Sequence, residues 1–400
     1  MPIGMGRLTC LQDLSYFVVG KQSSIGELRN MLQLQRSLSI TNLQNITNMM
    51  DAKDANLNSK DQLKELELQW NDEMNTTSDE SLEENVLEYL RPNEELKRLM
   101  IKSYGGKRFP TWLRESFLPK LVLLSIKNCK KSEFLPPLGQ LPRLTHLSIT
   151  KMQQVKHVDT EFIGKGKFKG FPSLVTLILE DMPQWVEWLT TQEGAFSHLQ
   201  NLHIKYCPRL KRISQRFFTL VTLEIQSCEE LEVFLPGEEF PNLGNLSVKN
   251  CPKLRELPQI VMKLVKLELQ DCGEVTMLPR LPSLCYLKLQ GLGDLQRLSC
   301  QLHGDNETVR GEFPCLTEVT IWNCPKLSEL PHLLPSLQKM EVRKCKNITA
   351  ISHDLELSKD KEYPLLKELI LKDCTELRGL KHNLPTLEKL ENRDNEMSST

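Results

Sequence analysis

The chain has 400 residues, of which 40% are hydrophobic, and a formal net charge of −1 at pH 7. This length exceeds the roughly 250–300 residues that one globular core supports, so we expect several domains or a repeat array that grows in one dimension. The near-neutral charge excludes a generally basic nucleic-acid-binding protein. We find no apolar run of roughly 18 residues that could cross a membrane and no signal peptide.

The N-terminal part is predicted to alternate strands with short helices. Residues 1–45 read as degenerate repeats without a polar cap, which suggests an excerpt of a longer protein or a truncated gene product. Residues 46–113 are predicted to be early helix–strand repeats. They contain an acidic insertion at 71–85, for which we expect a solvated, mobile loop. Ser81 and Glu84 predict a capping box that opens a helix.

The charge of the chain changes sign before its middle. Residues 1–100 carry 10 Lys and Arg against 16 Asp and Glu, whereas residues 101–170 carry 14 against 4. This basic block, residues 101–170, fits either ordinary solvated lysines or a docking surface for an acidic protein partner. Aromatic residues do not interleave with the lysines, which argues against nucleic acid. The residues predicted to make an intramolecular docking contact are Lys102, Lys127, Lys130 and Lys131.

Residues 114–390 repeat one phrase, and its clearest copy is 243–258, LGNLSVKNCPKLRELP. Leu246 and Val248 alternate with polar residues, which predicts a short half-buried strand. Pro252 ends the strand because proline has no N–H for a ladder. Copies begin about 20 to 33 residues apart, which is the leucine-rich-repeat period. One copy cannot bury its own apolar face, so neighbouring copies must stack.

The fold class that follows is an α/β repeat solenoid. We expect a leucine-rich-repeat horseshoe with a parallel β-sheet on the concave face. The convex face should carry turns, 3₁₀ pieces and short helices. Residues 391–400 are predicted to be a polar tail, and the rest to form one continuous repeat domain.

Eight of the twelve cysteines occupy one position of the repeat. Their spacing follows the repeat and not a disulfide framework, and no C-x-x-C or Cys/His cluster indicates a metal site. We therefore predict buried reduced thiols and a cytoplasmic protein. These cysteines are Cys129, Cys207, Cys228, Cys251, Cys272, Cys324, Cys345 and Cys374.

Six segments carry a resemblance to a known family. They are LTCLQDLSYFVVG (8–20), DAKDANLNSKDQLKELELQW (51–70), VLEYLRPNEELKRLMIKSYGGKRFPTWL (86–113), LPPLGQLPRLTHLSI (135–149), EFIG (161–164) and FPSLVTLILEDMPQWVEW (171–188). In this order they resemble the leucine-rich-repeat region of plant intracellular coiled-coil nucleotide-binding leucine-rich-repeat (NLR) disease resistance proteins.

The resemblance implies a non-enzymatic recognition domain of a plant innate immune receptor. It would bind a pathogen effector or a guarded host protein and restrain the nucleotide-binding switch domain of the same receptor. That domain precedes the repeats in the family and is not in this chain. We therefore expect no cofactor here, and ADP or ATP only in that upstream domain. The alternative is a general leucine-rich-repeat scaffold, such as a ubiquitin-ligase substrate adaptor.

Side chains between the inward leucines are expected on the concave face, which then suits protein recognition better than a small-molecule pocket. Trp322 stands out because exposed Trp, Tyr and Arg are typical of binding hot spots. The alternative is that Trp322 covers the aliphatic stems of its neighbours. Trp112, Trp185 and Trp188 are expected in the core. The residues predicted to bind protein are Tyr286, Lys288, Trp322, Lys339, Glu341, Arg343 and Lys372.

We find no catalytic motif. The eight histidines are scattered without an H-E-x-x-H pattern, and G-x-S-x-G is absent. The loop 164–170, GKGKFKG, lacks the order of a phosphate-binding loop. The sequence therefore predicts neither catalytic residues nor metal ligands.

Overall fold

A computed structural model describes most of the chain. The described residues are 4–20, 23–72, 79–113, 117–165, 169–188, 194–213, 215–234, 240–258, 261–298, 313–331, 334–349, 363–377 and 384–393. Parts of the predicted acidic insertion, of the loop 164–170 and of the polar tail lie outside these ranges. The chain divides into two compact units: unit 1 is Met1–Pro208 with Ser214–Phe217, and unit 2 is Arg209–Ile213 with Phe218–Thr400. The boundaries inferred from the sequence at 45, 113 and 390 stay predictions.

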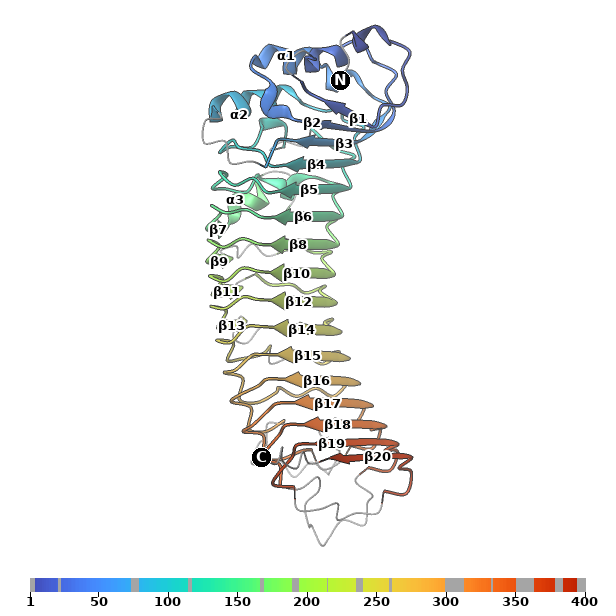
Figure 1. Cartoon of the computed structure of the whole chain (residues 1–400), viewed down its shortest axis with the longest axis vertical. Coiled ribbons are helices and arrows are strands. Elements are labelled where there is room, and N and C mark those ends of the chain that lie inside the picture. The colour runs from blue at the N-terminus through green and yellow to red at the C-terminus, as the bar shows by residue number, and fades with distance from the viewer. Residues whose placement is uncertain are drawn as a thin grey trace, which may run out of the picture. The chain divides into compact units, whose positions relative to one another are not determined.

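Unit 1 is built on parallel strands that pair in chain order (Figure 1). These strands are β1 (Tyr16–Val18), β2 (Arg36–Thr41), β3 (Leu63–Gln69), β4 (Arg98–Lys102), β5 (Leu123–Lys127), β6 (His146–Thr150), β8 (Thr176–Glu180) and β10 (Asn201–Lys205). Equivalent residues of neighbouring copies lie opposite each other, as Leu124 and Leu147 do. The two-residue strands β7 (His157–Val158) and β9 (Glu187–Trp188) pair separately.

Unit 2 repeats the arrangement with fewer irregularities. Its strands are β12 (Thr222–Gln226), β14 (Asn245–Lys249), β15 (Lys266–Gln270), β16 (Tyr286–Gln290), β17 (Glu318–Trp322), β18 (Lys339–Arg343), β19 (Glu368–Lys372) and β20 (Lys389–Arg393). The short strands β11 (Arg212–Ile213) and β13 (Val233–Phe234) form a second pair. The prediction of a parallel-strand repeat solenoid is confirmed, although these short second strands were not predicted.

The helices within the described residues are short, and all of them lie in unit 1. They are the 3₁₀ turns η1 (Met5–Arg7), η2 (Ile25–Leu28), η3 (Leu43–Asn45), η4 (Leu57–Ser59), η5 (Thr111–Leu113) and η6 (Leu138–Gln140), and the α-helices α1 (Met49–Asp54), α2 (Glu80–Tyr89) and α3 (Thr160–Ile163).

The capping box predicted for α2 is wrong. Asp79 is the N-cap, and its carboxylate accepts hydrogen bonds from the backbone N–H groups of Ser81 and Leu82. A carboxylate at the N-cap is also stabilised by the positive end of the helix dipole. The N-cap is therefore Asp79, two residues before Ser81.

The alternation of apolar and polar residues places the core. Leu246 and Val248 are 2% and 0% exposed, while Asn245 and Lys249 on the same strand lie on the opposite face. Burying a leucine contributes roughly 1.5–3 kcal/mol, and every copy of the repeat supplies several. Trp112, Trp185 and Trp188 are also buried, as expected.

A left-handed residue follows most long strands of both units. Asn128, Asn250 and Asp271 have φ values of 61°, 54° and 52°. Asn and Asp tolerate this conformation better than other non-glycine residues. The backbone N–H of Asn250 donates to the carbonyl of Gln270 at 2.8 Å, which carries the ladder past the end of the strand. The frequent Asn or Asp before the repeat cysteine therefore has a backbone role that the sequence analysis did not identify.

The eight repeat cysteines lie directly behind this turn and are all buried. Each described thiol can donate to the carbonyl two residues earlier, as Cys251 Sγ does to Lys249 O at 3.4 Å. Burial raises the pKa of Cys129 to about 12. In the next unit, a hydrogen bond with Cys228 and burial raise the pKa of Cys251. No disulfide forms among the described cysteines, which agrees with the prediction of reduced buried thiols.

The core of unit 1 also contains a cluster of aromatic rings. Phe171 stacks on Phe196 with ring centroids 4.8 Å apart, and Trp188 meets both Phe196 and Phe217 edge-on. Edge-to-face and offset contacts of this kind stabilise beyond the area that they bury.

Lys60 is a charged residue that lies wholly inside unit 1. Its Nζ donates to the carbonyl oxygens of Leu28 at 2.7 Å and Met31 at 3.2 Å, and no described carboxylate pairs with it. Burial lowers the pKa of Lys60 to about 8, because the charged amine loses its water.

We predict that Lys60 makes the stability of the chain depend on pH. The unfolded chain, with a lysine pKa near 10.5, binds more protons than the folded chain between pH 8 and 10.5, so stability rises with pH in this window. Urea titrations of wild type and Lys60→Met at several pH values measure it. Between pH 8 and 10.5, the free energy of unfolding of wild type should rise by on the order of 1–3 kcal/mol relative to that of Lys60→Met.

Lys97→Met is the matched control, because Lys97 is exposed on the same unit. It measures the change that the loss of an exposed lysine alone produces. A difference between Lys60→Met and wild type that does not change with pH would contradict the lowered pKa.

We also predict two classes of thiol. The exposed Cys10 and Cys315 should react within minutes with a thiol reagent such as dithionitrobenzoate, because their thiols meet solvent. The eight buried cysteines should react only after denaturant is added. Mass-spectrometric mapping of the labelled positions checks this, and early labelling of Cys251 or Cys272 would contradict the buried thiol ladder.

Candidate protein-binding surfaces

The seven residues predicted to bind protein lie on four adjacent strands of unit 2. Gln290, Trp322, Arg343 and Lys372 are aligned in register across β16 to β19, and Lys288, Thr320 and Glu341 form the next row. Tyr286, Glu318 and Lys339 form the third row. We call this surface the strand-face patch. The structure thus brings all seven together on one sheet face, where parallel strands lie about 4.8 Å apart.

Several charges of the strand-face patch already have partners on the same face. Lys339 lies 3.3 Å from Glu318, and Lys372 lies 2.8 Å from Glu391. Hydrogen bonds with Lys372 and Lys389 lower the pKa of Glu391 to about 2. These pairs are half exposed, so each stabilises the fold little, but a binding partner would have to replace them.

Arg343 is held in a similar way. Its Nε lies 2.6 Å from Glu341 Oε1. The same Nε has no hydrogen-bond partner of good geometry, so the contact is chiefly an attraction between charges. Arg343 and Glu341 therefore present a nearly neutral pair to an approaching protein.

Lys288 and Trp322 differ from these residues. Trp322 is 41% exposed, which is unusual for so large an apolar side chain. Lys288 has no ion pair within the described residues. Its register neighbours are Thr320 on β17 and Glu268 on β15, and Glu268 already pairs with Lys249 and Lys266. The ammonium nitrogen of Lys266 lies 5.1 Å from the centroid of the Tyr286 ring, a cation–π contact that marks one border of the patch.

One position on this face departs from the expected pattern. Ile370 occupies a place between inward residues of β19, where we expect solvent exposure, yet it is only 6% exposed. Its register neighbours are Glu341 and Glu391, and long carboxylate side chains can cover an apolar neighbour with their stems.

Three of the four lysines predicted to dock are paired with carboxylates of unit 1. Lys102 lies 2.6 Å from Glu67, Lys130 lies 2.8 Å from Asp72, and Lys131 lies 3.3 Å from Glu80. The remaining predicted docking residue, Lys127, is exposed and has no ion pair within the described residues.

The described ends of the acidic insertion supply two of these carboxylates. Hydrogen bonds with Lys130 and Asn128 lower the pKa of Asp72, although Asp72 lies 56 residues before Asn128 in sequence. The side chain of Asp72 is still 68% exposed. The solvated, mobile insertion therefore stays a prediction, although its described ends contact the basic block. The excess of acidic residues before the basic block was a signal for this contact, but it did not identify the partners.

Metal sites and membrane-spanning helices are two further features to consider in the described part of the chain. No group of three or more His, Cys, Asp or Glu side chains within it is placed to hold a metal ion. Nor does it include a helix with the length and apolar character needed to cross a membrane.

Comparison with known families agrees with this architecture. Residues 25–152 match the family described as R13L1/DRL21 LRRs. Residues 25–152 thus match a leucine-rich-repeat family, and both units have the parallel-strand repeat fold. The repeats are of the type found in plant disease resistance proteins, so the resemblance drawn from the sequence is confirmed.

The curated relatives are much longer than this chain. Putative disease resistance protein RGA4 of Solanum bulbocastanum is 39% identical over 215 residues, which cover 52% of this chain and 21% of that protein. Putative disease resistance RPP13-like protein 1 of Arabidopsis thaliana is 33% identical over 235 residues, which cover 54% and 22%. The chain thus spans about a fifth of the length of the relatives that it matches.

Among solved structures, the leucine-rich-repeat domain of the type III effector XopL is similar at a TM-score of 0.38 and 18% identity, over 63% of this chain and 72% of that chain. This likeness is too low to bear on function.

Proposed function

We propose that this chain is the protein-recognition domain of a plant innate immune receptor. Its ligand would be a pathogen effector or a guarded host protein. The similarity to repeat regions of disease resistance proteins supports the receptor context. The sheet face of unit 2 supports recognition, because it offers a broad row of partly exposed polar side chains around one exposed tryptophan.

The observation that carries the proposal is the exposure of Trp322, which lies diagonally across β16 and β17 from Lys288. A tryptophan at the centre of an interface buries a large area and is a common hot spot. Lys288 can accept a carboxylate of the ligand without losing an existing ion pair. Lys339, Glu341, Arg343 and Lys372 would form a rim that fixes orientation, because each is already neutralised on the same face.

This assignment predicts which substitutions weaken binding. The chain is screened by two-hybrid selection against pathogen effectors and host proteins, and the Kd of a selected partner is measured by calorimetry. Trp322→Ala and Lys288→Glu should each raise the Kd at least about tenfold, since hot-spot truncations cost about 2 kcal/mol or more.

Phe218→Ala is the control, because Phe218 is an equally exposed aromatic residue of unit 2 outside the patch. It should leave the Kd unchanged. A partner that binds wild type and both patch variants equally well would contradict the strand-face patch as the binding site.

A second role is favoured by the basic block. The block would restrain the nucleotide-binding switch domain of the same receptor by docking on its acidic surface. Lys127 supports this role best, because it is exposed on β5 and unpaired among the described residues, whereas Lys102, Lys130 and Lys131 are engaged. Nucleotide would bind to that switch domain and not to this chain.

The restraint is tested by charge reversal in a full-length receptor that contains these repeats. Lys127→Glu should cause cell death in leaves without any ligand, because it repels the acidic docking surface. Lys97→Glu, which reverses an exposed lysine outside the block, should remain silent. A silent Lys127→Glu receptor that accumulates normally would contradict the docking role.

A further inference from the structure

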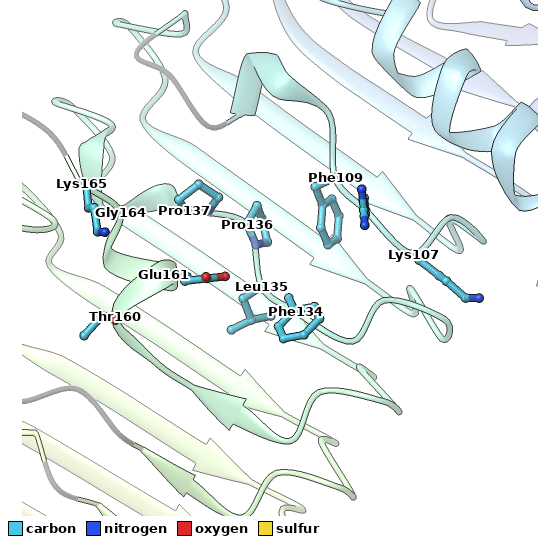
Figure 2. Close-up of a pocket in the computed structure, with 11 residues that line it drawn as sticks. Lys107, Phe109, Phe134, Leu135, Pro136, Pro137, Thr160, Glu161, Gly164 and Lys165 are labelled. Atoms are coloured by element: carbon cyan, nitrogen blue, oxygen red, sulfur yellow. The ribbon is translucent and has the colours of Figure 1, made fainter.

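Unit 1 contains a pocket of about 830 Å³ that none of the features above uses. One wall comes from the segment after β4, with Phe109, and another from the segment after β5, with Phe134, Leu135 and Pro136. Helix α3 and the residues next to it close a third side. Figure 2 shows Lys107 and Lys165 at opposite ends of the pocket, with the apolar side chains between them.

The first wall is held in place by helix α2. The carboxylate of Glu83 accepts from the backbone N–H of Gly105 at 2.7 Å, and that of Glu84 accepts from those of Lys107 and Arg108 at 3.0 and 3.1 Å. The hydroxyl of Tyr104 donates to Arg108 O at 2.6 Å. The backbone of this wall therefore keeps its shape without a ligand.

The other walls are tied to the first and to each other. The buried hydroxyl of Ser132 donates to Gly106 O at 3.0 Å and joins the two segments that follow β4 and β5. The side chain of Gln140 donates to Ile163 O at 3.3 Å and fixes α3 against η6. A pocket whose walls are already ordered loses little conformational entropy when it is filled.

Phe134 is the most informative residue of the pocket. Its side chain is 61% exposed, while Leu135 and Phe109 beside it are each 6% exposed. The hydration of an exposed ring next to a buried apolar floor is unfavourable, so an apolar group of a ligand can stack on the ring and displace water from it. The volume also lies within the range of about 300–1,000 Å³ that is usual for small-molecule sites.

The charge of the lining favours an anion. Lys107, Arg108 and Lys165 line the pocket together with one carboxylate, Glu161. Lys107 is already 2.9 Å from Glu80, but Arg108 and Lys165 have no ion pair within the described residues. Two available cations thus face one carboxylate, next to an apolar floor.

We propose that this pocket binds a small amphipathic anion, that is, an aromatic or aliphatic group that carries one carboxylate or sulfonate. The apolar part lies against Phe134, Leu135 and Pro136, and the acidic group pairs with Arg108. The proposal does not depend on the strand-face patch, because the pocket belongs to unit 1 and the patch to unit 2.

The test uses two fluorescent probes with the same rings. Anilinonaphthalene sulfonate is anionic, and N-phenyl-1-naphthylamine is its neutral analogue. We expect saturable binding of the sulfonate to the folded chain. Arg108→Gln should weaken the sulfonate about tenfold and leave the neutral probe unchanged, because only the charge-assisted contact is lost. Phe134→Ala should weaken both probes.

Phe218→Ala is the control, since it removes an exposed ring of unit 2 that is not in the pocket. Circular dichroism of each variant shows that the fold is kept. Sulfonate binding that is unchanged in both pocket variants, or lost only in Phe218→Ala, would overturn the proposal.

Competition identifies the occupant. Decanoate, a small aliphatic carboxylate, should displace the sulfonate from the wild-type chain. Displacement by a blocked acidic peptide rich in phenylalanine, but not by decanoate, would overturn the small anion and assign the pocket to a protein segment.

Discussion

Each coil of this protein is covered only by the coils on either side of it. A strand such as β14 hides Leu246 and Val248, yet these side chains have no core of their own to enter. Leu246 is buried because Leu223 and Leu267 occupy the same register on the neighbouring strands, and Ile225 and Leu269 do the same for Val248. Stability is therefore a sum of nearest-neighbour contacts within each unit, and every other feature is placed by this stacking.

The stacking leaves one face of the sheet available for recognition and sets how residues meet on it. Because the register is exact across β16 to β19, residues from four separate repeats become neighbours. Most charges on this face then find opposite charges on the adjacent strand or within their own strand. Lys288 has no such ion pair within the described residues. It differs from the other charged residues of this face only in its structural surroundings.

The sequence was sufficient for the fold and for the composition of the patch. The period of the leucines predicted the parallel strands, and the alternation around Leu246 predicted which side chains are buried. The ion pairs were not predictable, because a contact such as Asp72 with Lys130 spans 58 residues and depends on how a non-repeating insertion folds. The pocket was missed for the same reason, since its walls come from irregular segments after β4 and β5 and from α3.

The cap of α2 shows a smaller limit of pattern analysis. Ser81 and Glu84 have the correct spacing for a capping box, but Asp79 is an equally good cap two residues earlier. Local rules alone do not decide between such neighbours. Here the carboxylate of Glu84 accepts hydrogen bonds from the backbone N–H groups of Lys107 and Arg108. This tertiary contact replaces the local hydrogen bond that a capping box would require.

Asp72 and Glu80 have a consequence for any acidic partner of the basic block. Both carboxylates are tethered to the lysines that they contact, so they compete at the effective concentration of an intramolecular ligand, which is commonly millimolar. Negative charge alone is then not sufficient for a partner to bind tightly to this surface. A partner succeeds only if it adds shape or apolar contact to its charge, and the insertion thereby acts as a filter against nonspecific polyanions.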